Sequence, residues 1–95
     1  VSGRAKLYTV MSAHGLTKVK GTWELEVAEW LNNHNIKWTN NITPYKYWWN
    51  DEWHQYFPDF LLIETGDLIE VKGFKTARDS AKWAAVVDTR LIIID

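Results

Sequence analysis

The chain has 95 residues, with 12 acidic and 11 basic side chains and a net charge of −1. This length suits a single domain with one modest hydrophobic core, and we expect residues 1–95 to form one domain. The absence of cysteine excludes disulfides and thiolate metal sites, and no apolar run is long enough to cross a membrane. We therefore expect a cytoplasmic protein with no membrane partner.

The charges are unevenly distributed along the chain. Residues 1–23 carry four basic side chains and no acid, and residues 24–70 carry nine acids against two lysines. Residues 71–95 then carry five basic side chains against three acids. An acidic middle between basic ends suits a metal site flanked by phosphate-binding groups, but it is equally compatible with ordinary solvated charge.

The first half of the chain predicts an arm, a helix and an extended segment. Residues 1–21 have weak periodicity and predict an irregular basic arm with room for one short helix. Residues 23–33 predict a helix with Thr22 as N-cap, because their apolar residues recur at helical spacing. Residues 36–39 and 43–49 read as extended, in the manner of one bent strand.

The second half predicts a hairpin, a helix and a strand. Asn50-Asp51-Glu52 is a turn signal, and residues 55–64 and 67–73 predict a hairpin about Thr65-Gly66. Thr76, with Asp79 three residues later, predicts a capping box for a helix over 77–88. The apolar run 91–94 predicts a strand buried on both faces. The order α, three β, α, β predicts an α/β (α+β) fold in which helices flank a small mixed four-stranded sheet.

Seven tryptophans form two groups. Four lie in periodic segments and are predicted core residues: Trp23, Trp30, Trp38 and Trp83. Three surround the predicted turn: Trp48, Trp49 and Trp53. The second group is expected to cap the end of a small sheet, and the alternative is that it stacks on bases or sugars.

The predicted hairpin brings charged side chains together. With a two-residue loop at Thr65-Gly66, Asp59 lies opposite Lys72. Because side chains alternate between the faces of a strand, Asp59, Glu70 and Lys72 then share one face. Carboxylate oxygens are the ligands that Mg²⁺ prefers, so this face is a candidate metal site. The alternative is a cross-strand ion pair between Lys72 and Asp59, with Glu70 exposed.

The predicted helix adds a further carboxylate. On the helical wheel, Glu24 falls between Val27 and Leu31 and is the helix acid aimed toward the sheet. An acid in the first turn can also serve the helix dipole alone. The histidines at positions 14, 34 and 54 are isolated and are expected in surface or turn positions, with His54 the nearest to a substrate.

Pro58-Asp59, followed by Glu70-Val71-Lys72, resembles the signature of the PD-(D/E)XK nuclease superfamily, and Glu24 matches that superfamily's frequent additional acid. The strings around these motifs, 56–60 and 69–73, are similar to small phage-encoded endonucleases of the junction-resolving endonuclease I type and to related homing endonucleases. The resemblance covers residues 21–95. It implies a restriction-endonuclease-like core in 22–95 and hydrolysis of DNA phosphodiester bonds in a bacterial host cell.

The resemblance also implies roles for individual residues. Asp59, Glu70 and the Val71 carbonyl would bind Mg²⁺ or Mn²⁺, Glu24 would help to hold a second ion, and Lys72 would be the catalytic lysine. DNA phosphates would be contacted by two basic groups: Lys75, Arg78 and Lys82 near the second helix, and Arg4, Lys6, Lys18 and Lys20 in the arm.

Several functional alternatives stay open. Within the nucleases, the choice lies between a junction-resolving enzyme, which needs a homodimer and branched DNA, and a site-specific or nicking enzyme for double-stranded DNA. Outside them, the chain is either a non-catalytic DNA-binding module that retains the nuclease fold or a tryptophan-rich carbohydrate-binding domain.

Overall fold

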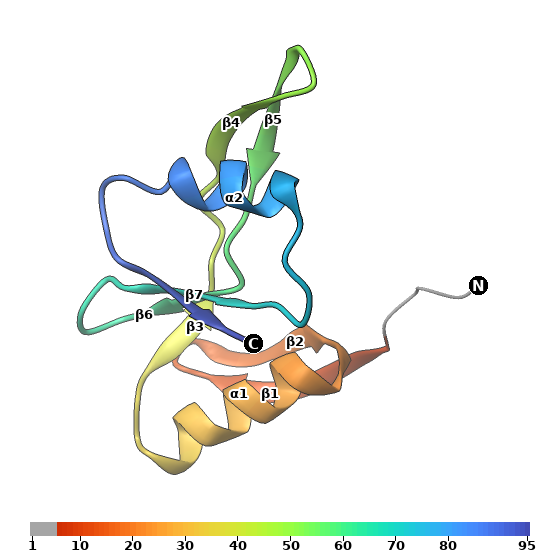
Figure 1. Ribbon diagram of the computed structural model, residues 1–95. Coiled ribbons are helices and arrows are strands. Elements are labelled where there is room, and N and C mark those ends of the chain that lie inside the picture. Colours follow the sequence, from red (N-terminus) through yellow and green to blue (C-terminus); the bar gives the residue numbers. More distant parts are fainter. Residues whose placement is uncertain (1–5) are drawn as a thin grey trace.

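The computed structural model describes residues 6–95 and shows a mixed α+β domain (Figure 1). In chain order the elements are β1 (Leu7–Ser12), β2 (Gly15–Lys20), α1 (Gly21–Asn33), β3 (Trp38–Asn40), β4 (Tyr45–Trp49), β5 (Glu52–Tyr56), β6 (Phe60–Leu62), β7 (Leu68–Val71), α2 (Ala77–Ala84) and β8 (Leu91–Ile94). Within residues 6–95, no helix combines the length and apolar character that a membrane crossing requires.

The central sheet has four strands in the order β3-β6-β7-β8. β3, β6 and β7 are antiparallel neighbours, and β8 pairs in parallel with β7. α1 and the β1–β2 hairpin cover one side of the sheet, and α2 lies on the other (Figure 1). Once the hairpins β1–β2 and β4–β5 are set aside, the order is α1, β3, β6, β7, α2, β8. The predicted small mixed sheet with two helices is therefore confirmed.

The predicted irregular arm is wrong for the residues that the structure describes. Residues 7–20 form an antiparallel hairpin, with pairs from Leu7–Lys20 to Ser12–Gly15. Val10, Ser12 and Val19 are buried, while neighbouring residues are exposed. Threonines and lysines at the exposed positions weaken the apolar alternation, and packing against α1 supplies the stability that local pattern did not reveal. Arg4 lies outside the described residues.

α1 begins at Gly21, two residues earlier than predicted, so Thr22 is inside the helix rather than its N-cap. The cap position is Lys20, whose backbone N–H donates to the Glu24 carboxylate at 3.0 Å. Because an acceptor is needed for the free N–H groups at a helix start, Glu24 stabilises this end of α1.

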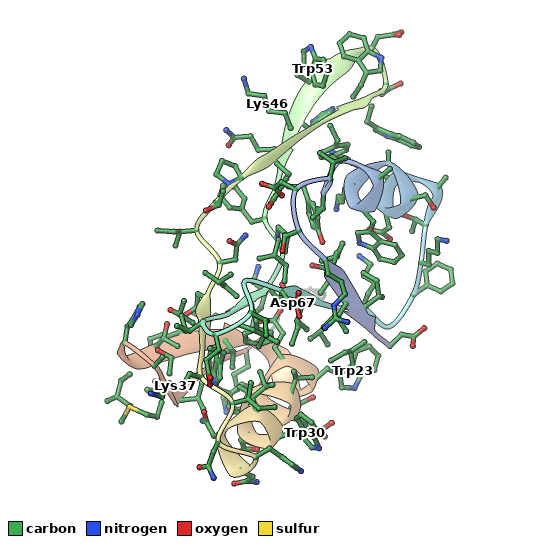
Figure 2. The ribbon with its side chains drawn as sticks, turned by 90° about the vertical axis from the view of Figure 1, so that its left-hand side faces the viewer. Trp23, Trp30, Lys37, Lys46, Trp53 and Asp67 are labelled. Carbon is green, nitrogen blue, oxygen red and sulfur yellow. The ribbon has the colours of Figure 1, made fainter. Side chains whose placement is uncertain are left out.

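The predicted apolar face of α1 is too broad. Ala28 and Leu31 are buried against the sheet, but Trp23 is 61 % exposed and Trp30 is 54 % exposed. Trp23 lies against Gly73 and Trp30 lines a hollow with Ile94, but both side chains, labelled in Figure 2, are more than half exposed, so the prediction that they belong to the core is wrong. Trp38 is fully buried and packs edge-on against Phe60, as predicted for a core residue, and Trp83 is half-buried.

Residues 36–49 are not one bent strand. β3 belongs to the central sheet, whereas β4 pairs with β5 in a separate hairpin. Between them, the Asn41 side chain bonds to the backbone of Thr43 and turns the chain before Pro44. The predicted turn is confirmed, with Asn50 and Asp51 at φ values of 54° and 64°, as a tight two-residue hairpin requires.

The β6–β7 hairpin is confirmed, but its register and extent differ from prediction. Residues 55 and 56 belong to β5, and the β6–β7 pairs are Phe60–Ile69 and Leu61–Leu68. The loop spans residues 63–66, and Leu62 N–H donates to the Asp67 carbonyl. Extending this register by one pair places Asp59 opposite Glu70 rather than Lys72. The shift is two residues, so Asp59 and Glu70 still share a face.

α2 and β8 also depart from prediction in part. The Thr76–Asp79 capping box is present, but α2 ends at Ala84 rather than at position 88, and Val87 is exposed. β8 forms as predicted, yet its four residues are half-buried instead of fully buried. Since β8 lies at the edge of the sheet, it has a neighbouring strand on one side only.

Candidate active site

Two carboxylates meet where β5 passes through Pro58 into β6. Glu70 on β7 is 9 % exposed, and its Oε1 accepts a hydrogen bond from the Tyr56 hydroxyl at 3.0 Å. Asp59 Oδ2 accepts a hydrogen bond from the Val71 backbone N–H at 2.8 Å. Each acid is therefore held by a donor from another strand, which fixes the pair without neutralising it.

Burial is the main cause that raises the pKa values of both acids. Burial, followed by the charge of Glu70, raises the pKa of Asp59 from 3.8 to about 7, although the Val71 N–H lowers it. Glu24 raises the same pKa, and Lys72 lowers it. Burial also raises the pKa of Glu70, against the hydrogen bond from Tyr56. A bound cation would relieve this cost, because carboxylates out of water are stable only when paired or coordinated.

Lys72 follows Val71 and approaches the site without pairing to Asp59. Its Nζ lies 3.3 Å from Oδ1 of Asp79, a carboxylate that is 1 % exposed at the start of α2. The alternative in which Lys72 pairs with Asp59 and leaves Glu70 exposed is wrong on both counts. The lysine instead connects the end of β7 to α2, while its charge still lowers the pKa of both site carboxylates.

Asp79 has two functions in this arrangement. Its Oδ2 accepts hydrogen bonds from the Thr76 N–H at 2.8 Å and from the Thr76 hydroxyl at 2.9 Å. Its Oδ1 faces Lys72 and, at 3.7 Å, Lys82. Burial alone would raise the pKa of Asp79, but the Thr76 hydrogen bonds and Lys72 together hold it below its ordinary value.

Tyr56 and Asp79 are site residues that the sequence prediction missed. The capping-box pattern identifies Asp79 as a helix cap but gives no reason to place it beside Lys72. Tyr56 precedes the Pro58-Asp59 motif, and its role depends on β5 ending directly beside β7. Both contacts cross between elements, so neither has a local signal.

Glu24 approaches the pair from α1. Its carboxylate accepts the Lys20 N–H, and its charge raises the pKa of Asp59. Glu24 and Val71 both line a hollow of about 290 Å³ at the start of α1. Within residues 6–95, no three His, Cys, Asp or Glu side chains form a group that could hold a metal ion.

The donor set nevertheless fits Mg²⁺. Mg²⁺ keeps several waters and is commonly bound through one or two carboxylates together with substrate phosphate, rather than by a closed protein cage. The structure provides Asp59 and Glu70 as such a pair, with Glu24 nearby. Val71, whose carbonyl is a predicted ligand, contacts the site through its N–H.

The three basic side chains near α2 each contact another side chain, and Lys82 is the one whose charge acts on Glu70. Arg78 Nε donates to the Tyr47 hydroxyl at 2.8 Å, and its guanidinium lies 3.3 Å from a ring nitrogen of His54. Lys75 lies over the Trp83 ring, with Nζ 5.6 Å from the ring centroid. Lys82 lowers the pKa of Glu70, which places its charge beside the carboxylates.

The basic residues of the β1–β2 hairpin lie on exposed positions. Lys18 Nζ donates to the Thr9 hydroxyl, and Lys6 lies over the Tyr8 ring. Lys20 is exposed next to the start of α1, close to Glu24. Contact between these residues and DNA stays a prediction.

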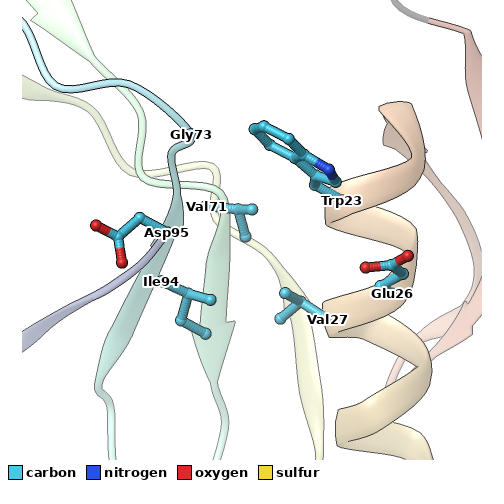
Figure 3. A pocket seen from close by; sticks show the side chains of 7 residues that line it. All are labelled: Trp23, Glu26, Val27, Val71, Gly73, Ile94 and Asp95. Atoms are coloured by element: carbon cyan, nitrogen blue, oxygen red, sulfur yellow. The ribbon is translucent and has the colours of Figure 1, made fainter.

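A cavity of about 320 Å³ lies between α1 and the end of β7 (Figure 3). Val71 and Val27 line it, and the Trp23 ring covers Gly73. A methyl group on Gly73 would overlap the Trp23 ring, so a larger residue there would require the exposed Trp23 side chain to move. Val71 alternates with Glu70 and Lys72 along the chain, so this cavity lies on the other side of β7 from the carboxylate pair.

No protein-family model, curated protein or solved structure matches this chain. Its function is therefore inferred from the chemistry of Asp59, Glu70 and Lys72.

Proposed function

We propose that the chain is a divalent-metal-dependent DNA endonuclease of PD-(D/E)XK type with a restriction-endonuclease-like core. One observation carries the proposal: burial and the charge of Glu70 raise the pKa of the half-buried Asp59, burial raises the pKa of Glu70, and the charge of Lys72 acts on both carboxylates. Such a pair destabilises the fold unless it binds a cation, which favours a functional role over a structural one. A phage or mobile-element origin belongs to the same proposal.

The residues of the site have distinct roles in this proposal. Asp59, Glu70 and the Val71 carbonyl would hold Mg²⁺ or Mn²⁺, with Glu24 contributing to a second ion. When bound, the metal supplies Lewis acidity, which lowers the pKa of a water and stabilises charge on the phosphate.

Lys72 and the residues around it complete the chemistry. The Lys72 ammonium would orient the attacking water or stabilise negative charge on the phosphate oxygens as the phosphorus–oxygen bond breaks. Asp79 would fix the position of that ammonium, and Tyr56 would orient Glu70. Because Asp79 is itself buried and accepts hydrogen bonds from Thr76, it gives Lys72 a rigid anchor.

The proposed substrate is DNA. Lys75, Arg78 and Lys82 lie on or next to α2, the helix whose Asp79 contacts Lys72, and these cations would contact phosphates without reading sequence. Junction resolution by a homodimer and site-specific cleavage or nicking of double-stranded DNA are two forms of the same proposed chemistry.

Cleavage assays with metal and with chelator test the proposal. Supercoiled plasmid, a four-way junction and its linear duplex counterpart are each incubated with Mg²⁺, Mn²⁺ or EDTA. We expect metal-dependent cleavage, which Asp59→Asn and Glu70→Gln each reduce by at least about 100-fold, the scale for loss of one electrostatic stabiliser.

The matched control is Glu64→Gln, which neutralises an exposed acid in the β6–β7 loop and is expected to leave cleavage unchanged. Cleavage that persists both in EDTA and in the Asp59→Asn variant would contradict the proposed metal-dependent endonuclease. Tight DNA binding without cleavage under any metal condition would favour the non-catalytic DNA-binding module instead.

A further inference from the structure

The β4–β5 hairpin presents an outer face that consists of Lys46, Trp48, Trp53 and Gln55. The strand register pairs Lys46 with Gln55 and Trp48 with Trp53 across the two strands. All four side chains are exposed, and Trp48 and Trp53 expose 52 % and 65 % of their surface. Figure 2 shows Lys46 and Trp53 near the end of the hairpin, far from Trp23 and Trp30.

The opposite face of the hairpin is already packed. Tyr47 and Tyr56 are buried, and His54 stacks on Tyr47 with ring centroids 5.4 Å apart. Arg78 of α2 bonds to Tyr47 on this inner face. The hairpin therefore attaches to the domain through its inner face, and the outer tryptophans contribute nothing to that attachment.

Pairing between the two tryptophans explains only part of their presence. Trp48 and Trp53 meet edge to face, with ring centroids 5.2 Å apart and ring planes at 76°. A cross-strand aromatic pair of this kind stabilises a hairpin by roughly 0.2–1 kcal/mol. More than half of each tryptophan still faces water. A smaller aromatic residue at either position could form the same cross-strand pair, so pairing alone does not explain two tryptophans.

The chemistry of the outer face fits a nucleic-acid strand. Exposed indole rings stack on bases of any sequence, and Lys46 and Gln55 supply a cation for phosphate and an amide for base edges. The outer face carries no acid: Asp51 lies in the turn, and Glu52 is paired with Trp49 on the inner face. An apolar protein partner would be met by a wider apolar patch without a lysine and a glutamine beside it.

The position of the face relative to the carboxylates suits one continuous strand. Tyr56, which bonds to Glu70, is the last residue of β5, and Trp53 precedes it by three residues on that strand. Three residues of strand span about 10 Å. Because Trp53 and Tyr56 lie on opposite faces of β5, a bound strand would pass around the edge of the hairpin to reach the carboxylates.

We propose that the outer face of the β4–β5 hairpin binds nucleic acid by stacking Trp48 and Trp53 on unpaired bases. Bases inside a duplex are stacked on each other and cannot be reached in this way, so the ligand is a single-stranded segment. In the proposed endonuclease, this segment would belong to the same strand as the phosphate at the carboxylates. This last statement rests on the proposed function, whereas the stacking itself does not.

The test measures binding to a fluorescein-labelled oligothymidylate and to a duplex of equal length, with the whole chain, in EDTA so that no cleavage occurs. We expect Trp53→Ala to weaken binding to the oligothymidylate by roughly 5- to 150-fold, the equivalent of about 1–3 kcal/mol per stacked base. Trp53→Phe keeps an aromatic ring and should retain most of the affinity. Duplex binding should change little.

Two further variants guard against a simple folding defect. Trp30→Ala removes a tryptophan of similar exposure from α1 and should leave binding unchanged. Lys46→Ala removes an exposed side chain, and it should weaken binding. The slope of log affinity against log salt concentration should also fall by about one, because one fewer counterion is released. Circular dichroism shows whether the Trp53→Ala variant keeps the fold.

The outcomes separate this proposal from the endonuclease. Single-stranded binding that depends on Trp48 and Trp53 supports the stacking face even if no cleavage is ever found. The stacking face is overturned if the oligothymidylate binds equally well to Trp48→Ala, Trp53→Ala and Lys46→Ala, or if Trp30→Ala weakens binding as much as Trp53→Ala. Binding of a glycan or peptide at this face, without single-stranded DNA, would also overturn it.

Discussion

Asp59 is the site residue whose negative charge is opposed most strongly by its surroundings in the fold. It lies beside Glu70, within the influence of Glu24, and its strongest local contact is a single backbone N–H from Val71. Burial and the charge of Glu70 hold its pKa near 7, so a proton stays bound to the folded protein in acid conditions where an exposed aspartate is ionised. The residue therefore weakens the fold at neutral pH when no cation is bound.

This leads to a prediction for the stability of Asp59→Asn without metal. Between pH 3.8 and about 7 the unfolded chain releases the Asp59 proton while the folded protein retains it, so the free energy of unfolding falls as pH rises through this window. Asparagine does not titrate and can still accept the Val71 N–H. We expect Asp59→Asn to be more stable than the parent protein at pH 8 by about 1–4 kcal/mol.

Urea unfolding in EDTA at pH 5 and at pH 8 checks this prediction. The advantage of Asp59→Asn should shrink at pH 5, because the parent protein regains part of its stability there. Adding Mg²⁺ at pH 8 should stabilise the parent protein and have little effect on the variant, since binding only to the folded state raises its stability. An asparagine variant that is less stable at pH 8 would show that Asp59 is held by compensating contacts.

The sequence predicts which residues form the site better than it predicts the contacts that each of them makes. Asp59 and Glu70 share a face as predicted because the register differs by two residues, and an even shift preserves the alternation of side chains. The ion pair of Lys72 with Asp79 is not predicted from the sequence, since it depends on where α2 begins in space. Tyr56 likewise reaches Glu70 only because β4–β5 is a separate hairpin that ends at the carboxylates.

Among the elements, α2 has the most direct influence on the candidate site. Its first turn contains Asp79, which caps the helix and contacts Lys72 at the end of β7. The capping hydrogen bonds and the ion pair use different oxygens of the Asp79 carboxylate. α2 can therefore position Lys72 while its own N-terminus stays capped. A shift of α2 would therefore move Lys72.

A comparison of Asp79→Asn with Thr76→Ala separates these two functions. Thr76→Ala removes a capping side chain, and we expect it to cost about 1 kcal/mol of stability with little change in cleavage. Asp79→Asn removes the charge that faces Lys72, and we expect it to lower the cleavage rate by about tenfold or more and to change its pH profile. The measurements are urea unfolding and single-turnover cleavage from pH 6 to pH 9.

Equal rates for Asp79→Asn and Thr76→Ala, at equal stability, would show that Asp79 is only a helix cap. Asp88→Asn is the matched control for charge. Asp88 is exposed beyond α2 and bonds to Tyr45 at 2.8 Å, so its neutralisation leaves Lys72 unaffected.

Element boundaries were predicted less well where local pattern and tertiary packing disagree. β1 and β2 bury only alternate small residues, so their apolar signal is weak, and the hairpin depends on α1 and on a bond from Ala13 to Trp38. α2 is shorter than its alanine-rich pattern indicates, and Val87, which the longer helix would include, is exposed and covers no buried surface. Such outcomes depend on neighbours that are distant in sequence.

At the scale of the whole molecule, the candidate site lies between two parts of unequal packing. The first part is the core shared by α1, β1–β2 and the central sheet, with Ala28, Leu31, Trp38, Phe60 and Ile69 among its buried residues. The second part is α2 with the β4–β5 hairpin, which projects beyond the sheet in Figure 1. Its connections to the first part include polar contacts, such as Tyr56 with Glu70 and Asp79 with Lys72.

This unequal packing predicts unequal local stability. Segments with few buried apolar contacts open at lower free energy than the core, so backbone amides of β4, β5 and α2 should exchange hydrogen faster than those of β6, β7 and the second half of α1. Hydrogen exchange followed by mass spectrometry measures this directly. Tyr56→Phe removes the hydroxyl that joins the hairpin to Glu70, and it should speed exchange in β4, β5 and α2 while leaving α1 unchanged.

Uniform protection across residues 7–94, or faster exchange in α1 of the Tyr56→Phe variant, would instead mean that the two parts unfold as one unit. The carboxylate pair would then lie inside a single cooperative core rather than at the boundary between a stable sheet and a more easily opened layer.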